Sequence, residues 1–401
     1  MFSFKGFQTQ DKNTHLEHLE DDIINRGAKG GDNAINFLKS VRDMLAGASG
    51  GVNMTVKWDG APAIICGVNP ENGKFFVGTK SVFNKTPKIN YTTSDIRKNH
   101  DGVVAKKLQV CLANLSRLNI KGILQGDLLF TDDLKAINID GEKMISFTPN
   151  TITYAVPINS DLGKRIARAR MGIVFHTSYS GKTMDKLSAS FGTVRGSSNR
   201  NIFLASAAYK ETAVMFSKSE LSRFDAQIRM AEGSLSKAAP ILDLMSKTSS
   251  DQLSVGFRLK TYFNYFIKNS NSSMGKVATM QEQFRDYFNN ILQAEIDAKK
   301  TPRGKERFIR AQKDGLRFID RNQSALYMAI ASHITLGNAK NTLLQKMSQI
   351  QSIGHFLRTS NGYRVTAPEG YVAVDSVAGA VKLVDRLEFS RQNFTMPKGW
   401  N

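Results

Sequence analysis

Lys57 is the residue of this chain with the clearest capacity for covalent chemistry. It stands in the stretch Lys57-Trp58-Asp59-Gly60, at the end of an alternating apolar and polar run over residues 52–57 that predicts a β-strand. The Asp-Gly pair predicts a turn, and the apolar run over 63–68 predicts that the chain returns as a hairpin. A lysine at such a strand end can act as a nucleophile when desolvation or neighbouring cations lower the pKa of its amine.

The Lys-x-Asp-Gly pattern is weak evidence by itself. Charged residue types at about 6% each and Gly at about 7% give it by chance in roughly one chain in ten of this size. A reactive lysine therefore needs partners carried by other elements. Strand patterns continue to about residue 180, with one predicted helix over 103–118 and no room for a long helix between 119 and 160. The predicted strands cover residues 74–80, 120–130, 144–147, 151–156 and 171–177.

Helical patterns surround and interrupt these strands. Residues 13–47 predict two helices separated by a group of glycines. A Gly-, Ser- and Lys-rich stretch over 180–200 predicts a junction, and residues 201–358 are then almost wholly helical in pattern, with breaks expected at Pro240 and Pro302. The strand pattern resumes at residue 361. This order predicts a helical insertion, and hence domains over 1–200, 201–360 and 361–401.

The charge of the chain favours a polyanionic partner. Its 401 residues include 55 Lys and Arg against 35 Asp and Glu, a net charge of +20. Nucleic acid is the simplest partner, although charge alone does not exclude a membrane surface. No apolar run approaches the about 18 residues of a membrane span, and the N-terminus lacks a signal-peptide core, so we expect a cytoplasmic protein that does not enter membranes. Cys66 and Cys111 lie in apolar segments, which predicts buried thiols in a reducing compartment.

Five further motifs follow the first lysine in a fixed order. They are Gly78-Thr79-Lys80-Ser81, Gln125-Gly126-Asp127-Leu128, Ile152-Thr153-Tyr154-Ala155-Val156, Glu369-Gly370-Tyr371-Val372 and Val381-Lys382-Leu383-Val384. With the Lys57 motif they resemble the series found in covalent nucleotidyltransferases, the superfamily of ATP-dependent DNA ligases, RNA ligases and RNA-capping guanylyltransferases. Each motif is weak alone, but six in the right order are more specific. The residues around 14–21 and 57–64 also look like those of proteins encoded by tailed phages.

The resemblance implies a fold and an activity. The fold would be α+β, an antiparallel-sheet nucleotidyltransferase domain (the ATP-grasp-like adenylation domain of ligases) with a large all-α insertion and no C-terminal oligonucleotide-binding domain. The activity would be that of an ATP- and Mg²⁺-dependent polynucleotide ligase, monomeric and, if phage-encoded, at work in the bacterial cytoplasm. Lys57 would take AMP from ATP, pass it to a 5′-phosphate, and a 3′-hydroxyl would then displace it, most simply at a nick in duplex DNA.

The other motif residues take supporting roles by the same resemblance. Lys382 would contact the α-phosphate and keep Lys57 deprotonated by like-charge repulsion, and Asp59 belongs to the catalytic motif. Asp127 and Glu369 are hard oxygen donors suited to Mg²⁺, or in the case of Asp127 to a ribose hydroxyl. Besides Lys57, Glu369 and Lys382, the nucleotide-binding positions would be Thr55, Val56, Gly60, Lys80, Asp127 and Tyr154, with the Tyr154 ring stacked on adenine.

The chain also departs from the pattern of the superfamily. Pro62 stands where DNA ligases usually place Arg, and Asp127 replaces the usual Glu of the third motif. Glu142 is a rival for that acid, although its flanks are less apolar. Val384 takes the place of the second basic residue of the last motif, and Arg386 is the nearest substitute. Contacts to ribose or to the nucleic-acid end must therefore come from other residues.

Nucleic acid would be held by the helical block. Its aromatic cluster over 257–266 could stack on bases, but core packing explains these residues equally well. The expected contacts to nucleic acid are Arg303, Lys305, Arg307, Arg310 and Arg386. Two alternatives to a DNA ligase stay open: an RNA ligase or RNA/DNA-junction ligase, and a non-catalytic basic phage protein that keeps the fold and only binds nucleic acid.

Overall fold

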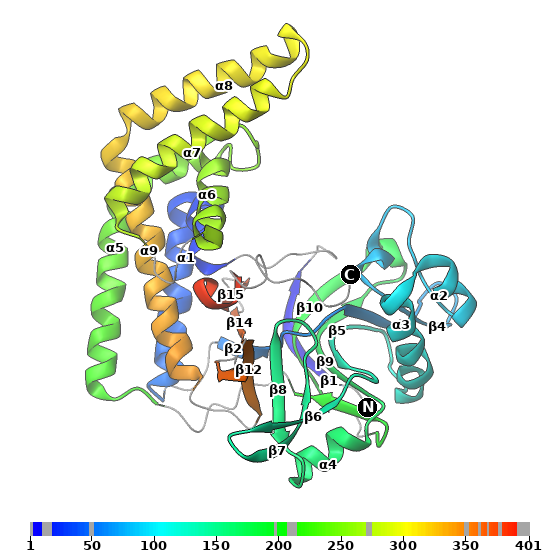
Figure 1. Ribbon diagram of the computed structural model, residues 1–401. Helices are drawn as coiled ribbons and strands as arrows, with labels where there is room; N and C mark the ends of the chain where they lie inside the picture. Colours follow the sequence, from blue (N-terminus) through cyan, green and yellow to red (C-terminus); the bar gives the residue numbers. More distant parts are fainter. Residues whose placement is uncertain are drawn as a thin grey trace.

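Three sheets and a group of long helices make up the computed structural model of the chain (Figure 1). The structure describes residues 3–9, 18–47, 52–195, 199–206, 215–269, 275–348, 353–359, 362–366, 369–375 and 379–390. Within them the protein is a mixed α+β protein with antiparallel sheets and a helical region over α5–α9, as the sequence predicts at this level.

The largest sheet, here called the large sheet, has seven strands in the order β1-β10-β9-β5-β3-β4, with β11 parallel to β9. Helix α3 (Gly102–Leu115), the helix predicted over 103–118, packs on this sheet, and α2 (Thr93–Asn99) precedes α3. Cys66 and Cys111 are buried as free thiols in the core beneath α3, where burial raises the pKa of both. The strands are β1 (Ser3–Thr9), β3 (Ala63–Val68), β4 (Phe75–Gly78), β5 (Ile123–Phe130), β9 (Met171–Ser180), β10 (Ser188–Arg195) and β11 (Ile202–Ala205).

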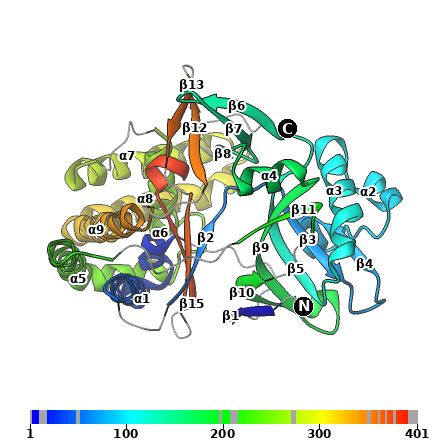
Figure 2. The ribbon, with the colours of Figure 1, turned by 90° about the horizontal axis from the view of Figure 1, so that it is seen from below.

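A three-stranded sheet, here called the central sheet, joins the two ends of the sequence. Its strands are β2 (Val52–Lys57), β14 (Gly370–Asp375) and β15 (Gly379–Val384), with β14 in the middle. Tyr371 and Leu383 from this sheet are buried in the same core as the helices. Seen from below, the central sheet lies between the helices and the large sheet (Figure 2). The strand-rich segments before and after the helical block therefore form one assembly, as predicted.

A five-stranded side sheet is likewise built from both parts of the chain. Its order is β13-β12-β8-β7-β6, so the strands after the helical block pair with β8. Helix α4 (Asp161–Arg168) follows β8, and no α-helix lies between 119 and 160, as predicted. The strands are β6 (Lys135–Ile139), β7 (Glu142–Phe147), β8 (Ile152–Pro157), β12 (Gly354–Thr359) and β13 (Gly362–Val365).

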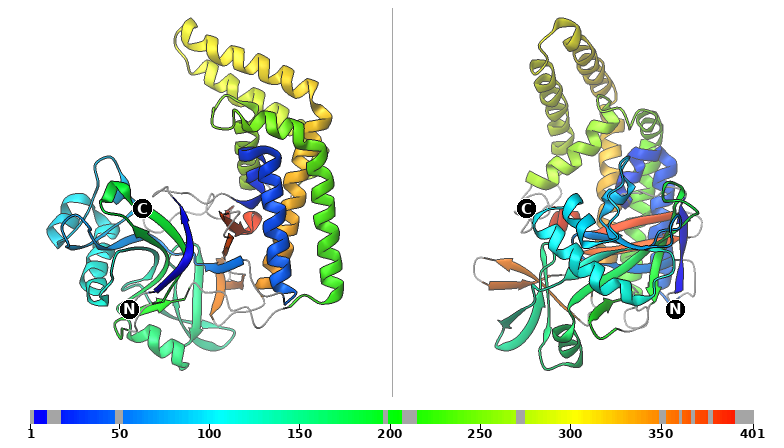
Figure 3. Two further views of the ribbon diagram at one scale, coloured as in Figure 1. Left: turned by 180° about the vertical axis from the view of Figure 1, so that it is seen from behind. Right: turned by 90° about the vertical axis from the view of Figure 1, so that its right-hand side faces the viewer.

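The long helices, α1 among them, pack into one unit around a common hydrophobic core. Helix α5 begins at a capping box formed by Ser217 and Glu220 and continues through Pro240, so the predicted break there is wrong. Helices α7 and α8 form a hairpin, here called the arm, which projects beyond the rest of the unit (Figure 3). The helices are α1 (Asp22–Leu45), α5 (Lys218–Ser246), α6 (Val255–Asn269), α7 (Val277–Asp297), α8 (Pro302–Arg321) and α9 (Gln323–Met347).

One local prediction holds and two fail. The break predicted between two helices over 13–47 is present as a kink at Gly27, whose φ of +64° is not helical, but the helix continues through Gly31, which fits against Leu235 of α5. The predicted junction over 180–200 contains β10, which pairs with β9 and β1. The predicted hairpin of β2 and β3 does not form, since β2 belongs to the central sheet and β3 to the large sheet.

A buried charge cluster fastens the end of the central sheet to the helices. Arg386, two residues after β15, donates to Asp21 (2.8 Å) and to the Asn264 amide oxygen (2.6 Å). His333 lies 2.9 Å from the same Asp21 carboxylate. Because Arg386 is only 4% exposed, it is not available to nucleic acid, and that prediction is wrong.

We expect Arg386→Met to lower the free energy of unfolding by about 3–5 kcal/mol, because it leaves buried carboxylates without their positively charged partner. Arg364→Met is the matched control, since Arg364 is 59% exposed and its ion pair with Glu388 (3.0 Å) is worth at most about 1 kcal/mol. Urea unfolding of both variants at neutral pH measures the two effects. Equal losses would contradict the account of the buried cluster.

Among the described residues, no helix is long and apolar enough to span a membrane.

Candidate functional site

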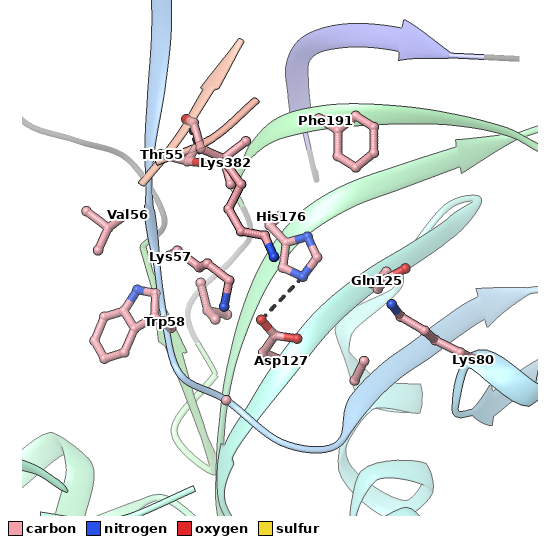
Figure 4. Close-up of a pocket in the computed structure, with 14 residues that line it drawn as sticks. Thr55, Val56, Lys57, Trp58, Lys80, Gln125, Asp127, His176, Phe191 and Lys382 are labelled. Atoms are coloured by element: carbon pink, nitrogen blue, oxygen red, sulfur yellow. Dashed lines mark hydrogen bonds and ion pairs between the residues drawn. The ribbon is translucent and has the colours of Figure 1, made fainter. Parts of the chain in front are cut away.

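A cavity of about 280 Å³ opens between the central sheet and the large sheet. Figure 4 shows the side chains around it. The central sheet contributes positions from all three of its strands, and the large sheet contributes β3, β5, β9 and β10. The lining residues are Thr55, Val56, Lys57, Trp58, Gly60, Ala63, Lys80, Gln125, Asp127, Val174, His176, Phe191, Val372 and Lys382.

Lys57 and Glu369 form an ion pair at the wall of this cavity. They come together because Lys57 pairs with Gly370 in the central sheet, which places Glu369 beside the last residue of β2. The Lys57 amine donates to the Glu369 carboxylate, and the two side chains are 26% and 7% exposed. The Lys57 amine is therefore accessible from the cavity, whereas the Glu369 carboxylate that it pairs with is almost completely buried.

The electrostatics of the pair differ from the sequence prediction. Burial acts to lower the pKa of Lys57, but the negative charges of Glu369 and Asp127 outweigh it and raise that pKa above its ordinary value. The prediction of a lowered pKa is wrong for this state of the protein. Burial also raises the pKa of Glu369 to about 7, against the opposing effect of the Lys57 charge.

Asp127 and Lys382 face the same space from opposite sheets. Asp127 projects from β5 and Lys382 from β15, and both point toward the Lys57 amine (Figure 4). The rival acid Glu142 is exposed at the start of β7 and does not line the cavity. The structure thus brings together Lys57, Asp127, Glu369 and Lys382 from four separate segments.

His176 also lies in the cavity, although the sequence reasoning missed it. Its Nε2 lies 3.5 Å from the Asp127 carboxylate, and β9, which carries it, pairs with β5. The missed signal was a histidine directly after the apolar run Ile173-Val174-Phe175. Phe191 of β10 was missed because the residues around it have the composition of a loop.

Gln125 and Lys80 line the other end of the cavity, away from Lys57 (Figure 4). The Tyr179 hydroxyl donates to the Gln125 amide oxygen at 2.6 Å. This bond fixes the amide so that its NH₂ group is the end available to a ligand. Together with the Lys80 ammonium, it gives this end of the cavity hydrogen-bond donors suited to oxygen atoms of a ligand.

Two predicted site residues serve the fold instead of the cavity. Tyr154 is fully buried, because β8 belongs to the side sheet, and its hydroxyl accepts a bond from the Asp59 backbone N–H at 2.7 Å. It cannot stack on a ligand in this cavity. Asp59 is 3% exposed, and its carboxylate accepts bonds from the backbone N–H groups of Thr151 (2.7 Å) and Ile152 (2.8 Å). Asp59 therefore anchors the turn after Lys57 to the start of β8.

Gly60 lets that turn approach β5. A Cβ atom at Gly60 would lie 2.5 Å from the Cβ of Asp127, so any other residue would displace the carboxylate from its place. Thr55, Val56 and Gly60 thus line the cavity mainly with backbone and small side chains.

The donor set around the cavity suits a hard divalent cation held jointly with a ligand. Among the described residues, no group of three or more His, Cys, Asp or Glu side chains forms a complete metal site. Mg²⁺, however, is usually bound through one or two carboxylates together with substrate phosphates and water. Asp127 and Glu369 fit that requirement, although Glu369 would have to exchange Lys57 for the cation.

Comparison with known proteins gives one match. No curated protein and no solved structure matches the chain. Residues 13–398, nearly the whole length, match a family described as a family of unknown function, DUF6267, and the chain belongs to that family.

Proposed function

We propose that the protein is an ATP-dependent polynucleotide ligase with a nucleotidyltransferase fold, which joins a 5′-phosphate to a 3′-hydroxyl through an AMP group carried on Lys57. The observation that supports this most is the meeting of Lys57, Lys382 and Asp127 at one cavity, with Glu369 ion-paired to Lys57, from segments up to 325 residues apart in the sequence (57 to 382). Lys57 and Glu369 meet through the pairing of β2 with β14, and Lys382 joins them through β15.

In the first step the Lys57 nitrogen attacks the α-phosphorus of ATP. A P–N bond forms, the bond from the α-phosphorus to the bridging oxygen breaks, and pyrophosphate leaves. Lys57 must first give up a proton, and Glu369 is the hydrogen-bonded group that can accept it. Lys382 supplies a positive charge near the reacting phosphate, which stabilises the charge that develops there. A Mg²⁺ ion held by Asp127 would neutralise phosphate charge.

In the later steps the AMP moves to the nucleic acid. The 5′-phosphate oxygen attacks the phosphorus of lysyl-AMP. The P–N bond breaks, and the Lys57 amine takes up a proton as it leaves. The 3′-hydroxyl then attacks the 5′-phosphorus, forms the phosphodiester and releases AMP. The donors Lys80 and Gln125 lie at the far end of the cavity, where they can hold phosphate or ribose oxygens.

His176 and Phe191 replace Tyr154 in this proposal as the rings that contact the base. We expect His176→Ala to raise the KM for ATP about tenfold, because stacking on an aromatic ring is worth about 1–3 kcal/mol per base. His176→Phe keeps a ring but loses the contact with Asp127, so it should restore most of the affinity. Steady-state AMP transfer at varied ATP measures both. Equal KM values for the two variants would show that the contact with Asp127, and not stacking, is what matters.

The experiment that tests the function is sealing of a labelled nick. The protein is incubated with ATP, Mg²⁺ and a duplex whose nick carries a labelled 5′-phosphate. We expect a joined strand with the phosphate and none when a phosphatase has removed it. Nicked DNA, nicked RNA/DNA hybrid and single-stranded RNA are run in parallel, because each is a substrate of one of the remaining candidates.

One observation favours a second candidate. The Lys57 amine is held in an ion pair with the buried Glu369 in the free protein, a structural role that is also expected of a non-catalytic protein that only binds nucleic acid. Binding of all three substrates without sealing, and without transfer of AMP to the protein, would support that alternative.

A further inference from the structure

The two helices of the arm carry opposite charges. Helix α8 has seven basic and three acidic residues, whereas α7 has one basic and four acidic residues. The arm is therefore not uniformly basic, and an anionic partner would be attracted to α8 and repelled from α7.

The arginines of α8 form a single stripe. With 3.6 residues per turn, Arg303, Arg307, Arg310, Arg317 and Arg321 fall within about 80° of one another around the helix axis. Helix α8 packs against α7 through the opposite side, where Gly315 and Ile319 are buried and Gly315 meets the Phe288 ring. Lys305 lies on that half-buried side as well, so it does not belong to the stripe.

The stripe is exposed and only weakly neutralised. The side chains of Arg307, Arg310 and Arg317 are 73%, 76% and 58% exposed, and their ion pairs are long, between 3.6 and 3.9 Å. Ion pairs of this kind contribute little and are easily exchanged for another anion. The arginines can thus turn to a phosphate without a large loss of existing contacts.

The length of the stripe matches a stretch of nucleic-acid backbone. From Arg303 to Arg321 the helix rises about 27 Å at 1.5 Å per residue, which corresponds to about eight base-pair steps of 3.4 Å. The free end of the arm extends past the top of the helical unit, on the side where the sheets lie (Figures 1 and 3).

We propose that this arginine stripe on α8 binds the phosphate backbone of a nucleic-acid duplex, over about eight base pairs beside the end that is to be joined. That the bound duplex carries the end to be joined rests on the proposed function. The two proposals can still fail separately, because binding of duplex to the arm does not require AMP transfer.

The test compares two triple variants with the same loss of charge. Arg303→Gln/Arg310→Gln/Arg317→Gln removes three charges from the stripe. Lys164→Gln/Arg168→Gln/Arg170→Gln removes three exposed charges in and just after α4, at the other end of the molecule (Figure 1). Binding of a fluorescent nicked DNA duplex is measured by anisotropy at several salt concentrations, with an RNA duplex and vesicles containing an anionic lipid as further ligands.

We expect the slope of log affinity against log salt to fall by about 2–3 in the stripe variant, at about 0.9 for each lost phosphate contact, and to be nearly unchanged in the α4 variant. AMP transfer to Lys57 should stay at the wild-type rate in both. The proposal is overturned if both variants lose the same slope, if the wild type does not bind duplex, or if the stripe variant loses vesicle binding only. If the wild type does not transfer AMP but the stripe variant still has the smaller salt slope, the proposed function is overturned and the proposal that the stripe binds duplex is kept.

Discussion

Lys57→Arg is expected to abolish transfer of AMP to the protein, by at least a thousandfold. Arginine keeps the positive charge and can still pair with Glu369, so the cavity should retain its shape. A guanidinium does not lose its proton in proteins, however, and cannot attack phosphorus. The measurement is incubation with α-labelled ATP and Mg²⁺, followed by denaturing electrophoresis. A P–N linked label should survive denaturation and alkali and be released by warm acid.

The control for this substitution is Lys382→Arg. Lys382 acts in our account through its charge, so arginine should preserve part of its effect and slow the transfer by about tenfold, equivalent to about 1.4 kcal/mol. Labelling that persists in Lys57→Arg would place the AMP on another residue and refute the assigned nucleophile. Complete loss in both variants, with normal ATP binding, would instead give both lysines a covalent or proton-transfer role.

Glu369→Gln is expected to slow AMP transfer by at least a hundredfold while leaving nucleic-acid binding within about twofold. Glu369 is the proton acceptor of Lys57, and the neutral amide cannot serve in that role. The stripe on α8 is a separate feature of the arm, so binding of duplex should not depend on Glu369. Comparing the loss of AMP transfer rate with the loss of duplex affinity shows whether Glu369 acts in the chemical step or in nucleic-acid binding.

The pH dependence of the AMP transfer rate tests the same role of Glu369. The active form of Glu369 is the carboxylate, and its pKa is raised to about 7 by burial. The transfer rate of the wild type should therefore rise about tenfold per pH unit below 7 and level off above it, and Glu369→Gln should lack this inflection. A wild-type rate that is flat between pH 5.5 and about 8 would contradict the role given to Glu369.

The elements that could be predicted from the sequence are those with a repeating pattern. The strand patterns around Lys57, Asp127, Tyr371 and Lys382 alternate or run apolar because each strand has at least one buried face, and all four strands are present. Motif order also predicted that these distant segments meet, which is visible in the pairing of β14 with β2.

The failures at the site concern side chains whose partners are far away in the sequence. Tyr154 looked like a ring at a site, but it packs at a tilt against Trp58 (ring centroids 4.9 Å apart) and accepts a hydrogen bond from the Asp59 backbone N–H. Arg386 looked like a basic surface residue, but Asp21 lies beside it across 365 positions of sequence. His176 was overlooked because only the pairing of β9 with β5 brings it to Asp127. Local patterns contain none of these contacts.

The central claim is that one amine carries the adenylyl group, and peptide mapping tests it most directly. The protein is incubated with ATP and Mg²⁺, digested at neutral to alkaline pH, and analysed by mass spectrometry. Our account predicts an AMP adduct on the peptide that contains Lys57, at that residue. An adduct on any other residue, or an unmodified Lys57 in protein that demonstrably binds ATP, would contradict it.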